Sequence, residues 1–75
     1  MTVNSQFASE VLRARREQNR TQAWVAERAD TSIRWYQSIE SGKVCPSFKV
    51  GIRIAIALNI DLNQLIRDVF GEGHE

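Results

Sequence analysis

Residues 21–43 read TQAWVAERADTSIRWYQSIESGK, and this stretch decides the fold. It contains two short runs, 22–28 and 33–41, and each follows a hydroxyl side chain, Thr21 or Ser32, that can cap a helix N-terminus. One side of the two runs is apolar at helical spacing, through Val25, Ala29, Tyr36 and Ile39. The stretch therefore predicts two short helices joined by a turn near residues 30–31.

The turn between these two helices carries residues that suit a tight connection. Asp30 tolerates a positive φ better than most residues do, and Ala26 is small where the two helices would cross most closely. Helices joined in this way cross at about 90–120°, so that the second can enter a DNA major groove while the first lies over the backbone. Residues 22–41 therefore predict a helix-turn-helix motif.

Apolar spacing predicts one helix before this motif. Phe7, Val11, Ala14 and Gln18 follow each other at intervals of four, three and four residues. Asn4 or Ser5 can cap the start of this helix, and Asn19-Arg20 breaks it.

Two more helices are predicted after the motif. Gly42 ends the second motif helix as a left-handed terminator, and Ser47 caps a helix over residues 48–58. Residues 61–64, DLNQ, form a capping box that opens a fifth helix reaching about residue 70. No segment alternates with period two for long enough to form a good strand. The predicted fold is therefore all-α, a compact five-helix bundle in a single domain of residues 1–75.

Composition limits the class of protein. The chain has 75 residues, of which 43% are hydrophobic and 25% charged, as in an ordinary small globular domain. The N-terminus lacks the basic start and apolar run of a signal peptide, and the longest nearly apolar stretch, 50–58, is too short to span a bilayer. Cys45 is the single cysteine and cannot form an internal disulfide. We expect a reduced, cytoplasmic protein with no membrane partner.

Charge is distributed unevenly along the chain. The net charge is only +1, but residues 1–53 carry nine Lys/Arg against five Asp/Glu, whereas residues 54–75 carry one Arg against four Asp/Glu. The first part therefore has a net charge of +4 and the second −3. This polarity fits a nucleic-acid partner, and it equally fits ordinary solvated faces.

No catalytic constellation is visible in the sequence. His74 stands alone, Cys45 has no partner base, and no metal-ligand spacing or phosphate-binding glycine loop occurs. We therefore expect no enzyme activity, no cofactor or metal, and no small-molecule ligand.

From Val11 to Leu65 the chain resembles the phage-repressor and Cro-like helix-turn-helix family, also called the Xre family, without gaps. The matching residues are Arg15, Thr21-Gln22, Val25-Ala26, Ser32, Ile39-Glu40, Gly42-Lys43, Pro46-Ser47, Ala55, Ala57-Leu58 and Leu62. The resemblance implies a lambda-repressor-like fold and a transcription regulator that binds double-stranded DNA in a sequence-specific way.

The resemblance also implies roles for individual residues. The residues expected to contact bases are Ser32, Ile33, Arg34, Gln37 and Ser38. Gln22 would contact a phosphate through its amide and the adjoining helix N-terminus, and Lys43 would also meet the DNA backbone. Arg15 and Glu40 would form the ion pair that ties the first helix to the third.

The chemistry of the third helix agrees with these roles. Arg34 can donate two hydrogen bonds to guanine, Gln37 can pair with adenine, and Ile33 can cover a thymine methyl. The alternative is that these side chains form an ordinary solvated helix face.

The chain departs from the family pattern at four positions. Asp30 replaces the usual turn glycine, and Arg20 stands where an apolar residue is common, so Arg20 either changes helix packing or adds a DNA backbone contact. Trp24 and Trp35 occupy positions that are usually polar. Trp35 can pack on sugar-phosphate or on Trp24, and satellite core packing is the commoner explanation for a tryptophan.

The last two helices are more apolar than a monomer needs. The residues predicted to face inward on the fourth helix and just after it are Phe48, Ile52, Ala55, Leu58 and Ile60. The surplus predicts an exposed patch in residues 47–70 and a homodimer interface made by Ile56, Leu65, Ile66, Val69 and Phe70. The alternative is an extended monomer core.

These observations predict a repressor or a restriction–modification controller-type protein that binds a palindromic operator as a dimer. The alternative is an antitoxin-like or other protein-binding module that uses the same fold.

Overall fold

The computed structural model describes residues 3–64 and 67, and all the regular secondary structure in this part of the chain is helical. The four helices are α1 (Val3–Glu17), α2 (Gln22–Arg28), α3 (Ile33–Glu40) and α4 (Phe48–Ala57). A further helical turn covers residues 62–64, where the fifth helix is predicted to begin. The all-α prediction is confirmed, and most of the predicted fifth helix lies outside the described residues.

Each of the last three helices starts at the side chain that the sequence predicts as its cap. The hydroxyls of Thr21, Ser32 and Ser47 accept hydrogen bonds from the backbone N–H three residues later, at 3.0, 3.0 and 3.2 Å. The Asp61 carboxylate likewise accepts from the backbone N–H groups of Asn63 and Gln64, at 2.9 and 3.3 Å. Local side-chain chemistry therefore sets where the helices begin.

The connections between helices use four left-handed residues. Asn19, Asp30 and Asn59 have φ values of 56°, 60° and 55°, and Gly42 has a φ of 83°. The predicted positive φ at Asp30 and the left-handed terminator at Gly42 are confirmed. The Asp30 carboxylate also lies 3.7 Å from Arg53 on α4, which links the turn between α2 and α3 to that helix.

The core lies where α1, α2, α3 and α4 meet. The motif residues predicted to face it are fully or almost fully buried: Val25, Ala26, Ala29, Tyr36 and Ile39. Val11 of α1 and Ile54 and Leu58 from the α4 region complete the same cluster. The helix-turn-helix is therefore anchored on its inner side only, and its outer side is left to solvent.

The inward face of α4 differs from the prediction. Phe48, predicted to face inward, is 84% exposed, whereas Ile54, which was not in the predicted set, is fully buried. The helix turns Val50, Ile54 and Leu58 toward the core and leaves the neighbouring stripe of Phe48, Ile52 and Ile56 outside or at the margin. Both stripes have the i, i+4 spacing of a helix face, so the spacing alone did not distinguish them.

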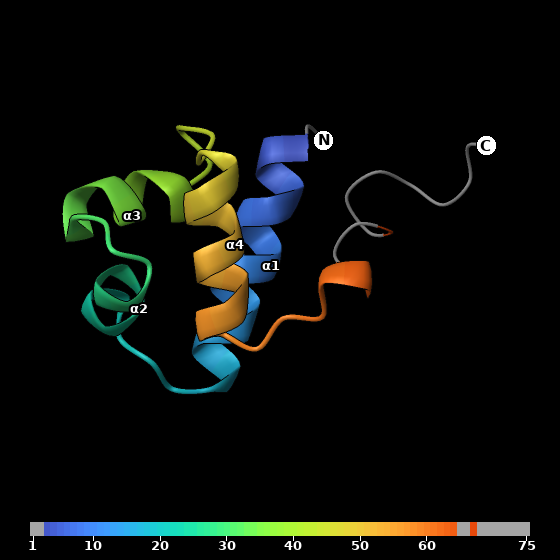
Figure 1. Ribbon diagram of the computed structural model, residues 1–75, viewed down its shortest axis with the longest axis horizontal. Helices are drawn as coiled ribbons and strands as arrows, with labels where there is room; N and C mark the ends of the chain where they lie inside the picture. Colours follow the sequence, from blue (N-terminus) through green and yellow to red (C-terminus); the bar gives the residue numbers. More distant parts are fainter. Residues whose placement is uncertain (1–2, 65–66, 68–75) are drawn as a thin grey trace.

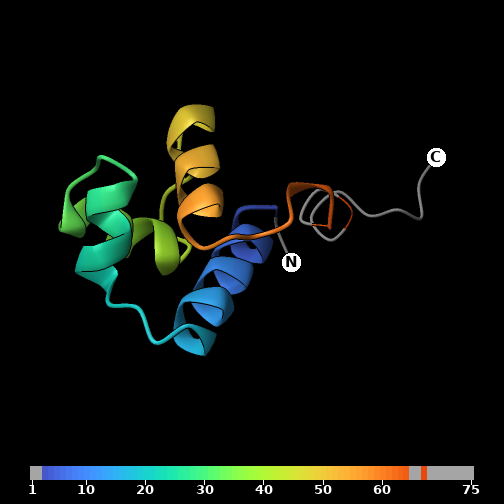
Figure 2. The ribbon, with the colours of Figure 1, turned by 60° about the horizontal axis from the view of Figure 1, so that its bottom comes forward.

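Figures 1 and 2 show how these elements are arranged. Helices α2 and α3 lie together at one end, drawn at the left, and α1 and α4 occupy the middle. Residues 59–64, which follow α4, run away from α2 and α3 toward the right in both views. No helix among the described residues is long and apolar enough to cross a bilayer.

Candidate nucleic-acid interface

The outer face of α3 is exposed. Tyr36, Ile39 and Glu40 point into the protein, while Arg34 and Gln37 are exposed and Ile33 is 45% exposed. Ser32, at the N-cap, is exposed as well, and Ser38 is half-buried. The five residues expected to contact bases therefore share one end of the molecule and are not packed in the core.

Two serines on this helix are oriented by the helix backbone. The Ser38 hydroxyl donates to the carbonyl of Arg34 at 3.3 Å, and the Ser41 hydroxyl donates to the carbonyl of Ser38 at 3.0 Å. Because each hydroxyl proton is used locally, the Ser38 oxygen is left with the role of an acceptor.

A two-pronged ion pair holds α1 to the end of α3. Arg15 donates from Nε to one Glu40 oxygen at 2.6 Å and from Nη2 to the other at 3.0 Å. The side chains are 15% and 6% exposed, so the pair is largely shielded from solvent. Arg15 also donates to the backbone carbonyl of Arg20 at 2.9 Å, which fixes the connection between α1 and α2. This is the contact that the family resemblance implied for Arg15 and Glu40.

Glu40 receives two further hydrogen bonds that the sequence analysis missed. The Tyr36 hydroxyl donates to it at 2.6 Å, and the Gln22 amide donates to it at 2.8 Å. Burial alone would raise the pKa of the Glu40 carboxyl, but the hydrogen bonds from Arg15, Tyr36 and Gln22 outweigh this effect and lower it. Burial and the adjacent carboxylate raise the pKa of Tyr36. Glu40 is thus held as a carboxylate beneath the outer face of α3.

Gln22 connects this buried carboxylate to that outer face. Its amide nitrogen donates to Glu40, and its amide oxygen accepts a hydrogen bond from Gln37 Nε2 at 3.0 Å. The family resemblance implied a phosphate contact for Gln22 and a base contact for Gln37, and no contact between the two side chains was predicted. The structure brings the two side chains together at the junction of α2 and α3.

The unusual residues Arg20 and Trp24 lie against each other. The guanidinium carbons of Arg20 and Arg28 lie 4.1 and 4.3 Å from the centre of the Trp24 ring. Trp24 itself is half-buried and packs against the core cluster. Of the alternatives for this tryptophan, satellite core packing is the one observed, and Arg20 contributes a cation–π contact that an apolar residue would not.

We expect this contact to be measurable as a coupling between the two residues. Arg20→Ala should lower the free energy of unfolding by about 0.5–1 kcal/mol, because the cation–π contact is partly exposed. In a Trp24→Leu background the same change should cost much less. Chemical denaturation of the four proteins measures the difference, and equal costs in both backgrounds would show that no coupling exists.

Lys43 and Trp35 are two further exposed residues on or next to α3. Lys43 is exposed and directly follows Gly42, whose left-handed conformation carries the chain away from α3. Trp35 is 44% exposed on α3 itself. Lys43 is therefore able to reach a ligand that contacts α3, and the indole of Trp35 is partly open to solvent.

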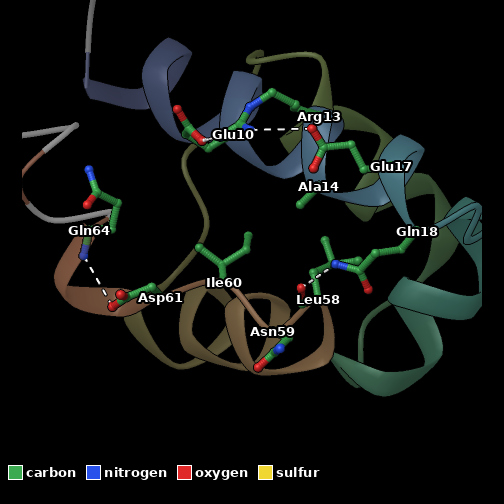
Figure 3. Close-up of a pocket in the computed structure, with 10 residues that line it drawn as sticks. All are labelled: Glu10, Arg13, Ala14, Glu17, Gln18, Leu58, Asn59, Ile60, Asp61 and Gln64. Carbon is green, nitrogen blue, oxygen red and sulfur yellow. Dashed lines mark hydrogen bonds and ion pairs between the residues drawn. The ribbon is translucent and has the colours of Figure 1, made fainter.

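The opposite end of the molecule has a different character. A pocket of about 200 Å³ lies between α1 and residues 58–64, and Gln18 donates across it to the Leu58 carbonyl at 2.5 Å (Figure 3). Its lining includes the carboxylates of Glu10, Glu17 and Asp61. Arg13 is the one cation in that lining, and it is paired with both glutamates. This lining carries three carboxylates against one guanidinium and would repel a phosphate backbone, so the outer face of α3 is the better candidate for nucleic acid.

The described residues contain no group of three or more His, Cys, Asp or Glu side chains that could hold a metal ion. Cys45 is exposed in the loop between α3 and α4. The candidate site among the described residues is therefore the outer face of α3, together with the side chains that hydrogen-bond to Glu40 behind it.

Comparison with known proteins agrees with this geometry. A sequence model of the helix-turn-helix family matches residues 11–65, which include α2, α3, α4 and the last seven residues of α1. Searches among curated proteins and among solved structures found no match. The matched segment covers most of the chain and includes the whole motif. The chain belongs to the helix-turn-helix family of Xre and phage-repressor-like proteins, and it is a DNA-binding transcription regulator.

Proposed function

We propose that this protein represses or controls transcription by binding a palindromic operator as a homodimer. The observation that best supports this is the outer face of α3, which exposes Arg34 and Gln37 and is held from behind by the Arg15–Glu40 ion pair. A recognition helix must be both exposed and rigidly placed, because a shift of one ångström would misalign its hydrogen bonds with base edges.

In this proposal α3 lies in the major groove. Arg34 donates two hydrogen bonds to guanine O6 and N7, Gln37 pairs with adenine, and Ile33 contacts a thymine methyl. Ser32 and Ser38 contribute the remaining polar contacts, with Ser38 accepting from a base amino group.

Two residues contact the DNA backbone in the same arrangement. Lys43 is exposed next to the C-terminal end of α3 and pairs with a phosphate. Gln22 has one amide N–H bonded to Glu40, and its second N–H and the start of α2 face the same strand. These contacts set the register of α3 without reading sequence.

The dimer would form at the end away from α3. Ile56 near the end of α4 is 68% exposed, and an isoleucine with that exposure is suited to an interface. The other residues proposed for the interface, Leu65, Ile66, Val69 and Phe70, lie outside the described residues. An interface at this end leaves both copies of α3 open, and a two-fold dimer places them about 34 Å apart, one helical turn of DNA.

DNA binding is tested most directly by its salt dependence. The protein should retard a duplex that it has selected from a random pool, and the affinity should fall by about 10³-fold or more between 50 and 200 mM salt if six or more phosphates are contacted per dimer. Gel retardation at a series of salt concentrations measures this. Absence of any selected sequence would contradict the proposed function.

The dimer is tested by sedimentation at micromolar concentration. The wild-type protein should sediment as a species of twice 8.6 kDa. Ile56→Lys should shift it toward the monomer, because a charge would be buried in the interface. Lys49→Ala on the exposed side of α4 is the control and should leave the dimer intact. A wild-type protein that stays at 8.6 kDa would rule the homodimer out.

A protein-binding role is the second candidate, because Phe48 is 84% exposed and Trp35 is 44% exposed. An antitoxin-like module would use such side chains to bind a partner protein. A chain that binds only protein would neither retard the selected duplex nor respond steeply to salt, so the same assay separates the two candidates.

A further inference from the structure

We infer that Glu40, acting through Gln22, fixes the orientation of the Gln37 side-chain amide and so makes Gln37 prefer adenine over guanine. Glu40 and Gln22 would be positioning residues and Gln37 the residue that touches the base. The inference rests on the proposed DNA-binding function and specifies how one base pair in each half-site is chosen.

The first step concerns the Glu40 carboxylate, which fixes the orientation of the Gln22 amide. Glu40 is 8% exposed and its ionised side chain can only accept hydrogen bonds. Gln22 lies 2.8 Å from one of its oxygens, so the Gln22 amide must present its NH2 group there. The opposite orientation would place two acceptor oxygens in contact at that distance, which is unfavourable.

In the second step, the fixed orientation of the Gln22 amide fixes that of Gln37. With its NH2 group held by Glu40, Gln22 turns its amide oxygen toward α3. That oxygen accepts from Gln37 Nε2 at 3.0 Å, so the NH2 group of Gln37 also has a fixed place. The negative charge of Glu40 polarises the neutral amide of Gln22, which strengthens the hydrogen bond that Gln22 accepts from Gln37.

The third step is what Gln37 then offers to DNA. One of its N–H bonds is used by Gln22, and the remaining N–H and the amide oxygen form one donor beside one acceptor. Adenine presents N7 as an acceptor and N6 as a donor in the major groove, which matches this pair. Guanine presents two acceptors, N7 and O6, and one of them would meet the amide oxygen.

A glutamine without this support can turn its amide over. It can then offer both N–H groups to guanine, or one N–H group and the amide oxygen to adenine, so it discriminates poorly between the two purines. The connection from Glu40 through Gln22 therefore restricts Gln37 to one of two orientations. The restriction affects which base is preferred more than how tightly DNA is bound.

The test compares base preferences among variants. Duplexes selected by the wild-type protein define the site, and the base pair whose preference disappears in Gln37→Ala is the one that Gln37 reads. At this base pair the wild-type protein should favour adenine over guanine by roughly tenfold or more. In Gln22→Met, which is of similar length but offers no amide, the ratio should fall below about threefold, with preferences elsewhere in the site unchanged.

A double substitution tests whether the direction of the hydrogen bonds that connect Glu40, Gln22 and Gln37 matters. In Gln22→Glu/Glu40→Gln, the new amide oxygen at position 40 can accept from Arg15 Nε and Tyr36, and its NH2 group can donate to the carboxylate at position 22, while Arg15 Nη2 loses its acceptor. That carboxylate can in turn accept from Gln37, so adenine preference should return to near the wild-type ratio. Thermal unfolding monitored by circular dichroism confirms that each variant is folded at the temperature of the binding assay.

The outcomes are distinguishable. If Gln22 serves only as a phosphate contact, Gln22→Met will weaken binding to all sequences equally and leave the adenine ratio unchanged, which overturns the inference. A folded double variant that fails to regain the ratio also overturns it, as does a Gln37→Ala protein with unchanged preferences. Failure of the wild-type protein to select any sequence would instead contradict the proposed function itself.

Discussion

Replacing Glu40 with alanine is expected to lower the free energy of unfolding by about 3 kcal/mol or more. The substitution removes the acceptor for Arg15, Tyr36 and Gln22 at once, while their donors stay at the α1–α3 junction. The Tyr36 side chain is fully buried, so its hydroxyl would have no solvent to replace the lost partner. A 75-residue domain has a total stability of roughly 4–11 kcal/mol, so this single change should remove a large part of it.

Urea denaturation of the wild type and four variants checks this expectation. Glu27→Ala on the exposed side of α2 is the matched control, since it also removes one glutamate from a helix of the motif, and it should change the stability by about 0.5 kcal/mol or less. In an Arg15→Met background, Glu40→Ala should cost less than in the wild type, because the ion pair is already absent. A cost for Glu40→Ala similar to that of Glu27→Ala would mean that the network does not stabilise the fold.

The same network should make stability depend on pH in two separate ranges. The folded pKa of Glu40 lies below its unfolded value of about 4.3, so its contribution is complete above that value and is lost as the pH falls through the folded pKa. Tyr36 has a folded pKa above its unfolded value of about 10, so its contribution is lost as the pH rises past 10. Between about pH 5 and 9 these two groups should leave stability unchanged, and Glu40→Ala should lessen the loss at acid pH.

The starts of α2, α3 and α4 were predictable because each depends on a few neighbouring atoms, whereas the predicted start of α1 was wrong: α1 already begins at Val3, and the predicted caps Asn4 and Ser5 lie inside it. Thr21, Ser32 and Ser47 cap the helices that follow them, and the chain turns at Asp30 and Gly42, which accept a positive φ. These effects act within three or four residues and leave a direct mark on the sequence. The bounds of α2 agree with the prediction at both ends.

Which side of α4 faces the core was not predictable in the same way. Two stripes on this helix, Phe48–Ile52–Ile56 and Val50–Ile54–Leu58, have the same spacing and similar hydrophobicity. Only packing against the other helices decides between them, and it selects Ile54 and Leu58. When a helix is apolar on more than one side, its sequence pattern does not show which side faces the core.

The side-chain connections of the site fall between these cases. Tyr36 and Glu40 lie four residues apart on one helix, so their contact could have been inferred from spacing. Arg20 and Arg28 each lie four residues from Trp24, and this spacing is a signal for the observed stacking. The bond between Gln22 and Gln37 spans two helices and depends on the crossing of α2 and α3, which no local pattern specifies.

Arg34→Ala is expected to weaken binding to the selected operator by about 10-fold or more and to remove the preference at one base pair of each half-site. Arg34 is exposed on the outer face of α3, and a two-bond contact with guanine discriminates by about 1–3 kcal/mol. The change should leave the fold intact, because the described contacts of Arg34 involve its backbone carbonyl and not its guanidinium.

Lys43→Ala is the matched comparison, since it removes one positive charge from the same end of the molecule without removing a base contact. It should weaken binding to all sequences about equally and reduce the salt slope by about one unit per lost contact. Selection from a random pool separates the two variants: the site chosen by Lys43→Ala should equal that of the wild type, and the site chosen by Arg34→Ala should be degenerate at one position per half-site. If both variants select the wild-type site unchanged, Arg34 contributes only charge, and another side chain on the outer face of α3 must read that base pair.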